Sequence, residues 1–121
     1  MKKKILVVED NECNRRLVTD ILRHFGYTVA QATDGSMALK MVEKYCPDLI
    51  LMDMQMPVMD GFEAIKQLRN DEKTSGIKII AVTSFAMAEE KERILATGVD
   101  QYIAKPIDTR KLPKIVKKMI G

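Results

Sequence analysis

Short apolar runs alternate along the chain with longer segments in which apolar residues recur every three or four positions. The runs have the length and composition of strands, and the recurring spacing indicates amphipathic helices. We predict strands at 5–8, 27–30, 48–52, 79–82 and 101–104. The predicted helices are marked by apolar positions within 17–25, 37–42, 62–68, 87–95 and 112–120. The pattern is therefore a strand followed by a helix, repeated five times.

Glycine, aspartate and proline residues mark where several helices begin and end. Gly26 and Gly98 are placed to cap the first and fourth helices, because glycine readily adopts the left-handed conformation that ends many helices. Asp34 is a candidate N-cap of the second helix, and Pro47 stops that helix. A loop at 54–60 separates the third strand from the third helix.

The last helix contains a proline close to its start. Pro113 is harmless if the helix begins near Arg110 or Lys111, because the first backbone donors of a helix have no partners within it. If the helix begins at Asp108, a kink is expected. The sequence leaves both starts open.

Strands that alternate with helices of this length are typical of right-handed crossovers and a parallel sheet. The first, third and fourth strands are apolar almost throughout, as expected for strands buried on both faces. The predicted fold class is therefore α/β, with a doubly wound five-stranded parallel sheet. In such folds ligands lie beyond the carboxyl ends of the strands.

Acidic, hydroxyl and basic side chains stand where the apolar runs stop. They are Glu9 and Asp10 after the first strand, Asp53 after the third, Thr83 after the fourth and Lys105 after the fifth. The carboxyl ends of parallel strands share one edge of the sheet, so these side chains should converge on one crevice. Carboxylates packed together repel one another unless a cation lies between them. Mg²⁺, or Mn²⁺ in its place, suits such a cluster because it takes oxygen ligands and keeps several waters.

The same cluster has the components for phosphoryl transfer. A carboxylate such as Asp53 can attack phosphorus and form an acyl phosphate. A cation, the Thr83 hydroxyl and the Lys105 ammonium would then neutralise charge on the phosphoryl oxygens. Taken alone, an aspartate at a strand end is usually a helix N-cap, and a lone lysine is usually solvated. Their occurrence together at successive strand ends favours a functional site.

Length and charge set bounds on the kind of protein. The 121 residues fit a single domain, 1–121, and the formal charge is +3. From Lys105 onward six basic residues stand against one acid, Asp108, so this segment carries about +5. We interpret it as a solvated helix face and expect no direct contact with nucleic acid, because no aromatic residues interleave with the basic ones.

No leader segment follows Met1, and no apolar run approaches the roughly 20 residues that span a bilayer. We therefore expect a cytoplasmic protein that makes no membrane contact. Cys13 and Cys46 lack the spacing of metal ligands and are expected to be ordinary packing or surface residues. His24, the only histidine, is expected on a half-exposed helix surface without a catalytic role.

Several motifs resemble the response-regulator receiver domains, the CheY-like group, along essentially the whole chain. They are Ile5–Asn11, Asp48–Pro57, Asp60–Gly61, Ala81–Thr83 and Lys105–Pro106. The resemblance implies the strand order 2-1-3-4-5. Segments 83–88 and 102–107 resemble stand-alone, DivK-like regulators, and also receivers attached to hybrid kinases. We expect a single receiver domain without an output domain, with a fragment of a hybrid kinase as the alternative.

The resemblance also implies roles for residues of the cluster. Asp53 looks like the phospho-acceptor. Glu9 and Asp10 look like the acidic pair that holds Mg²⁺, with Asp10 favoured as the direct ligand and the backbone carbonyl of Gln55 as a further one. Gln55 and Phe85 also resemble positions that tune how quickly water removes the phosphoryl group.

On the other side of the crevice, Thr83 looks like the switch hydroxyl and Lys105 like the phosphate-contacting lysine. The family usually has a cis peptide between Lys105 and Pro106, which would aim Lys105 into the site. Tyr102 stands where family members carry an aromatic that rotates between exposed and buried positions. A strand residue that simply faces outward is the alternative for Tyr102.

The expected function is that of a phosphorylation switch in two-component signal transduction. A histidine kinase or a histidine phosphotransfer protein would donate the phosphoryl group. The surface of the fourth helix, fifth strand and fifth helix would then change its affinity for a downstream protein. The protein is expected to be a monomer or a weak, phosphorylation-dependent dimer. It would promote its own phosphotransfer and autodephosphorylation, and would not turn over external substrates.

Two other classes fit the sequence less well. An aspartate-nucleophile phosphatase would need a second acid two residues after Asp53, where Gln55 stands, and a cap insertion to hold its substrate. A flavodoxin-like nucleotide binder would need a glycine-rich phosphate loop after the first strand, which the sequence lacks.

Overall fold

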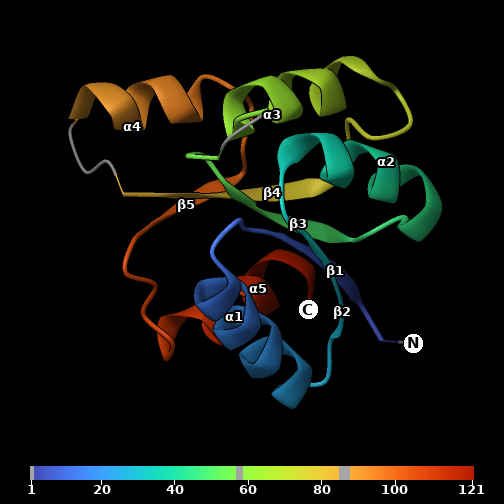
Figure 1. Cartoon of the computed structure of the whole chain (residues 1–121), viewed down its shortest axis with the longest axis vertical. Helices are drawn as coiled ribbons and strands as arrows, with labels where there is room; N and C mark the ends of the chain where they lie inside the picture. Colours follow the sequence, from blue (N-terminus) through green and yellow to red (C-terminus); the bar gives the residue numbers. More distant parts are fainter. Residues whose placement is uncertain (1, 57–58, 85–87) are drawn as a thin grey trace.

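Strands and helices alternate strictly in the computed structural model, which describes residues 2–56, 59–84 and 88–121 (Figure 1). In chain order the elements are β1 (Lys4–Val8), α1 (Glu12–His24), β2 (Thr28–Ala32), α2 (Gly35–Tyr45), β3 (Leu49–Asp53), α3 (Gly61–Asn70), β4 (Lys78–Thr83), α4 (Ala88–Leu95), β5 (Gln101–Ala104) and α5 (Lys111–Ile120). Neighbouring strands are parallel, and the sheet order is β2-β1-β3-β4-β5. The predicted fold class and strand order are confirmed.

Helices cover both faces of the sheet, with α1 and α5 on one side and α2, α3 and α4 on the other (Figure 1). Side chains of β3 alternate between these layers, as the geometry of a strand requires. Leu49 and Leu51 pack in the layer of α1 and α5, whereas Ile50 and Met52 pack in the layer of α2, α3 and α4. Every residue of β3 is buried, which explains why the strand reads as a continuous apolar run. The central strands are therefore held in place from both sides.

Polar caps and left-handed residues set the helix boundaries. Gly26 and Gly98 have φ values of 93° and 95°, in the turns that follow α1 and α4. Asp34 caps α2, and its side chain accepts the backbone N–H three residues on at 2.8 Å. Asn11 and Asp60 cap α1 and α3 in the same way. Both α1 and α3 begin at the carboxyl edge of the sheet, next to the predicted site.

Two local predictions are refined by the structure. The second strand runs over Thr28–Ala32 rather than 27–30, because the Tyr27 N–H is still bonded at 3.2 Å to the carbonyl of Leu22 in the turn after α1. The last helix begins at Lys111, which places Pro113 in its first turn. Of the two starts left open by the sequence, the harmless one is therefore correct.

The two cysteines, the histidine and the lysines of the C-terminal helix lie at the surface, as expected from the sequence. Cys13 and Cys46 are exposed free cysteines, and His24 is exposed in the last turn of α1. The lysines of α5 are exposed while Leu112 and Val116 are buried, so the basic charge lies on a solvated helix face. Within the described ranges, no helix has both the length and the apolar character required to cross a membrane.

A close backbone approach ties the start of α3 to the end of β3. A Cβ atom built on Gly61 would lie 2.7 Å from the Asp53 carbonyl oxygen and 2.9 Å from Met54 Cα. Both neighbours are backbone atoms, so neither can move without displacing the strand end that carries Asp53. The position therefore requires glycine for reasons of space.

We predict that Gly61→Ala destabilises the protein by about 1–3 kcal/mol, because the added methyl group overpacks this contact. Urea unfolding followed by circular dichroism measures the change. Gly76→Ala is the matched control, since a Cβ atom at Gly76 meets nothing within 4 Å. The control should stay within about 0.5 kcal/mol of wild type. Equal losses in the two variants would contradict the steric explanation.

Candidate functional site

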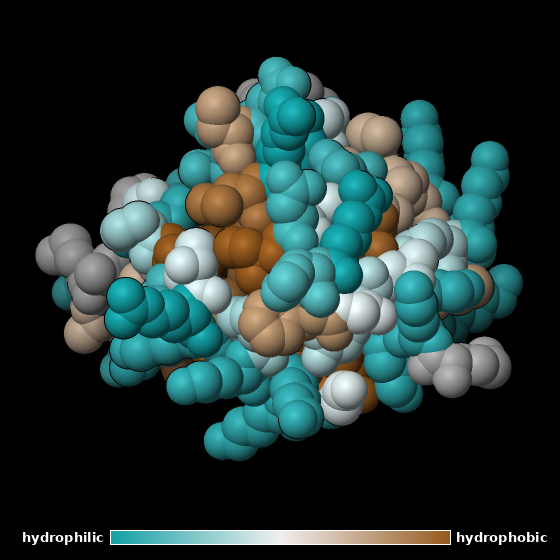
Figure 2. Space-filling model, turned by 90° about the horizontal axis from the view of Figure 1, so that it is seen from below, coloured by the Kyte–Doolittle hydropathy of each residue, from teal (hydrophilic) through white to brown (hydrophobic). Residues whose placement is uncertain are grey.

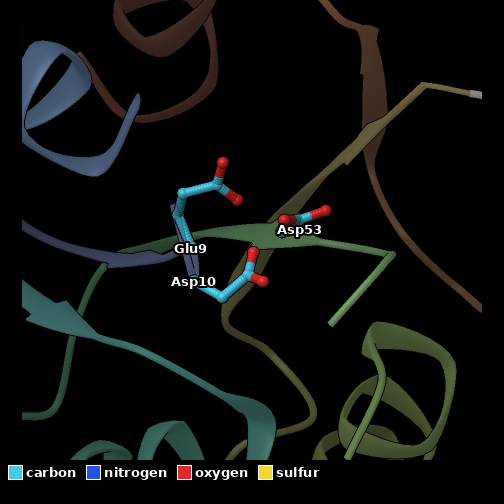
Figure 3. Close-up of side chains that lie close together, drawn as sticks. All are labelled: Glu9, Asp10 and Asp53. Atoms are coloured by element: carbon cyan, nitrogen blue, oxygen red, sulfur yellow. The ribbon is translucent and has the colours of Figure 1, made fainter. Parts of the chain in front are cut away.

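The sheet brings the predicted site residues to one edge. Glu9 and Asp10 follow β1, Asp53 ends β3, Thr83 ends β4 and Lys105 follows β5. Figure 3 shows the three carboxylates directed toward a common space at the ends of their strands. One oxygen from each of Glu9, Asp10 and Asp53 lies within 4.8 Å of the other two. The convergence expected from a parallel sheet is therefore present in the structure.

Two of the three carboxylates are withdrawn from water. Asp53 is 1% exposed and Glu9 is 6% exposed, whereas Asp10 is exposed. The Lys105 ammonium offsets part of their charge: its Nζ lies 3.1 Å from Asp53 Oδ2 and 3.4 Å from Glu9 Oε1. Asn14, in the first turn of α1, adds a hydrogen bond from Nδ2 to Glu9 Oε1 at 3.2 Å. One ammonium thus stands against three acidic groups.

The ionisation of Glu9 reflects this imbalance. Burial raises the pKa of Glu9 to about 7, and the nearby Asp53 carboxylate adds to the rise. Burial works to lower the pKa of Lys105, but the carboxylates of Asp53 and Glu9 raise it above its ordinary value. The raised pKa means that this edge of the sheet disfavours the ionised form of Glu9.

The donor set fits a hard divalent cation. Glu9 Oε2 is buried, and no partner in the described part of the chain forms a hydrogen bond with it. An oxygen of this kind is costly unless something positive faces it. Opposite ligands of an octahedral Mg²⁺ lie roughly 4 Å apart, so carboxylate oxygens within 4.8 Å of one another need only small movements to share an ion. The set contains oxygen donors and neither thiolate nor imidazole, which favours Mg²⁺ over zinc or copper.

A cavity of about 400 Å³ gives access to the buried Asp53 carboxylate. Its lining includes Glu9, Asn14, Asp53 and Lys105 at the polar end, and otherwise consists largely of apolar residues from α1, the central strands and segment 106–107. Leu17 of α1 lines it while remaining 49% exposed. The face formed by α1 and α5 carries a group of hydrophobic side chains surrounded by hydrophilic ones (Figure 2). The opening of the cavity to the acidic cluster is therefore lined in part by apolar side chains.

Gln55 makes contacts that the sequence did not indicate. Its backbone N–H donates to Asp53 Oδ1 at 3.0 Å. Its side-chain Nε2 donates to Thr83 Oγ1 at 2.7 Å, and its Oε1 accepts the N–H of Ser84 at 3.1 Å. The resemblance assigned Gln55 a backbone ligand role and an effect on dephosphorylation, but the link to Thr83 depends on how the ends of β3 and β4 lie side by side. No local sequence signal reports that arrangement.

The other predicted residues lie around the same edge. The peptide bond between Lys105 and Pro106 is cis. Tyr102 of β5 is half-buried on the side of α4, with Lys91 Nζ 5.1 Å from the centre of its ring. Its rotation between two positions stays a prediction. Phe85, proposed to affect dephosphorylation, lies outside the described residues.

Fold and site together define a class: CheY-like α/β proteins with an acidic cluster and a lysine at the carboxyl edge of a parallel sheet. Residues 5–117 match the response regulator receiver domain family, and the chain belongs to this family. Receiver domains of two-component response regulators are phosphorylation-based switches, so this chain is a signalling switch of that kind. The resemblance drawn from the sequence is confirmed.

Individual relatives cover the whole length. The chain is 40% identical over 121 residues to the polar-differentiation response regulator DivK of Brucella ovis, covering 100% of this chain and 98% of that protein. The Vibrio cholerae chemotaxis protein CheY4 superposes with a TM-score of 0.93 at 32% identity, covering 99% and 100% of the two chains. The receiver domain of a Pseudomonas aeruginosa sensor histidine kinase superposes with a TM-score of 0.91 at 36% identity, covering 100% and 99%, and has a magnesium ion coordinated in its active-site cleft.

The raised pKa of Glu9 predicts an unusual pH dependence for the metal-free protein. The folded state keeps Glu9 protonated until the pH approaches its raised pKa of about 7, whereas the unfolded chain releases the proton near the ordinary pKa of 4.5. Stability from this group is therefore full at low pH, falls as the pH rises from 4.5 to 7, and stays low above that. The loss at pH 8 amounts to at most about 3 kcal/mol.

We expect Glu9→Gln to remove this decline, so that the variant exceeds wild type in stability at pH 8 but not at pH 4.5. Urea unfolding in a chelator at both pH values measures the difference. Glu72→Gln, at an exposed position in the turn after α3, is the control and should keep the wild-type slope. Identical pH slopes in wild type and Glu9→Gln would show that Glu9 does not titrate in this way.

Proposed function

We propose that Asp53 is the phospho-acceptor of this receiver domain. The observation that carries the proposal is the Asp53 carboxylate, which is 1% exposed, lines a cavity and is paired at 3.1 Å with the Lys105 ammonium. A buried carboxylate at the edge of a cavity can be reached by a donor while bulk water is largely kept away. The lysine neutralises charge that a phosphoryl group would bring.

The reaction is a transfer of one phosphoryl group from a phosphohistidine. A carboxylate oxygen of Asp53 attacks phosphorus, the P–O bond forms as the P–N bond breaks, and the imidazole of the donor leaves with the electron pair. The product is an acyl phosphate on Asp53 and a histidine that takes a proton from solvent. Lys105 stays in contact with the acceptor through Nζ and stabilises the added charge. Hydrolysis of the acyl phosphate by water would make the protein its own phosphatase.

Glu9, Asp10 and Asp53, with the backbone carbonyl of Gln55, would hold Mg²⁺, or Mn²⁺ in its place. When bound, such an ion supplies charge neutralisation at the phosphoryl oxygens. Receiver domains generally bind Mg²⁺ at an acidic pocket, and the structurally similar Pseudomonas aeruginosa domain has the ion in its active-site cleft. The support from this chain is the orphaned Glu9 Oε2 and the proximity of the three carboxylates.

The proposed output is a change of surface. The Thr83 hydroxyl would donate a hydrogen bond to the phosphoryl group, and Tyr102 would respond on β5. The face of α4, β5 and α5 would then change its affinity for a downstream protein. The phosphoryl donor would be a histidine kinase or a histidine phosphotransfer protein in the cytoplasm. Residues 1–121 would act as a single receiver domain, as a monomer or a weak phosphorylation-dependent dimer. The near-complete coverage of DivK supports this domain assignment.

Asp53→Asn should abolish phosphorylation, because an amide cannot form an acyl phosphate by the same attack. Incubation with acetyl phosphate and Mg²⁺, followed by intact mass spectrometry, tests this. Wild type should gain one phosphoryl group, and Asp20→Asn, an exposed position on α1, should behave as wild type. A phosphoryl group gained by the Asp53→Asn variant would place the acceptor elsewhere.

A further inference from the structure

The side chain of Gln55 forms a bridge between the ends of β3 and β4. Its Nε2 lies 2.7 Å from Thr83 Oγ1, and its Oε1 lies 3.1 Å from the backbone nitrogen of Ser84. The backbone N–H of the same residue is bonded to Asp53 Oδ1 at 3.0 Å. A single residue thus contacts the proposed acceptor, the proposed switch hydroxyl and the first residue after β4.

The chemistry of the partners fixes the orientation of the amide. The backbone N–H of Ser84 can only donate, so the atom that faces it must be the Gln55 carbonyl oxygen. The amide NH₂ group is then directed at Thr83, whose oxygen accepts. A hydroxyl oxygen that accepts a hydrogen bond here must direct its own proton elsewhere. The bond from Gln55 therefore restricts the directions in which the Thr83 hydroxyl can donate its own hydrogen bond.

We propose that Gln55 is a latch: its side chain holds Thr83 and Ser84 in the unphosphorylated arrangement and releases them when Thr83 turns to a phosphoryl group on Asp53. The latch rests on the proposed roles of Asp53 and Thr83. Gln55 cannot follow Thr83 freely, because its own N–H is bonded to Asp53. Thr83 is 0% exposed, so water cannot replace the amide donor that its oxygen loses. Gln55 is thus a positioning residue that stabilises the resting state.

The consequence is a specific effect on the switch equilibrium. A contact made only in the resting state adds to the free energy that phosphorylation has to supply. Removing it should favour the activated state and tighten the binding of any phosphoryl mimic that selects this state. Such an effect is separate from the rate at which water hydrolyses an acyl phosphate, so it is best measured with a mimic that is not hydrolysed.

Titration with beryllofluoride in excess Mg²⁺ provides the test, followed by the NMR signal of the Ser84 amide, which every variant retains. Gln55→Met keeps the side-chain length and the backbone carbonyl but loses the amide. It should bind beryllofluoride about fivefold to tenfold more tightly than wild type. Gln67→Met is the matched control, because Gln67 is an exposed glutamine on α3 whose side chain bonds to Glu63. Its affinity should equal that of wild type.

A double-mutant cycle separates the latch from a general loss of packing. In a Thr83→Ala background the amide has lost its main partner, so Gln55→Met should change the affinity about twofold or less. Unchanged or weaker binding by Gln55→Met, or an equal gain in both backgrounds, would overturn the latch while leaving the acceptor role intact. Failure of the wild-type protein to bind beryllofluoride would overturn the proposed function itself, and the latch with it.

Discussion

The burial of the Asp53 carboxylate against Glu9 and Lys105 is the interaction on which the rest of the site depends. Asp53 and Glu9 are both nearly inaccessible to water, and a single ammonium lies 3.1 Å from one and 3.4 Å from the other. A lysine can compensate one carboxylate at close range but not a cluster. The sheet edge is therefore short of positive charge, which fits the proposed binding of a divalent cation.

The cluster cannot relieve its repulsion by moving apart, because the fold holds its members in register. Asp53 pairs with Val82 across β3 and β4, and both faces of β3 are covered by apolar layers. The backbone positions of the strand ends are therefore fixed, and the acids can move apart only by rotation of their side chains. The repulsion at the edge of the sheet contributes to the raised pKa of Glu9, and Glu9 Oε2 has no hydrogen-bond partner among the described residues.

Much of this arrangement could be predicted from the sequence, since the signals are local or follow from topology. Apolar runs gave the strands, and the rule that parallel strands share a carboxyl edge brought Glu9, Asp53 and Lys105 together. The details that escaped prediction depend on contacts between segments distant in the chain. The side chain of Gln55 finds Thr83 only because β4 lies beside β3, and Gly61 is required only because α3 begins against the end of that strand.

The same edge also explains how a local charge can act at a distance. The carbonyl of Thr83 accepts the backbone N–H of Lys105 at 2.8 Å, so the residue proposed to sense the phosphoryl group and the residue proposed to contact it are joined through the backbone. Tyr102 lies three residues before Lys105 on β5 and packs on the side of α4 beneath Lys91. A displacement of the Thr83 backbone would therefore be transmitted to β5 through this hydrogen bond, and under the proposed latch Gln55 would oppose it. If both proposals hold, the switch equilibrium reflects a competition between the Gln55 hydrogen bond to Thr83 and a new contact of Thr83 with the phosphoryl group.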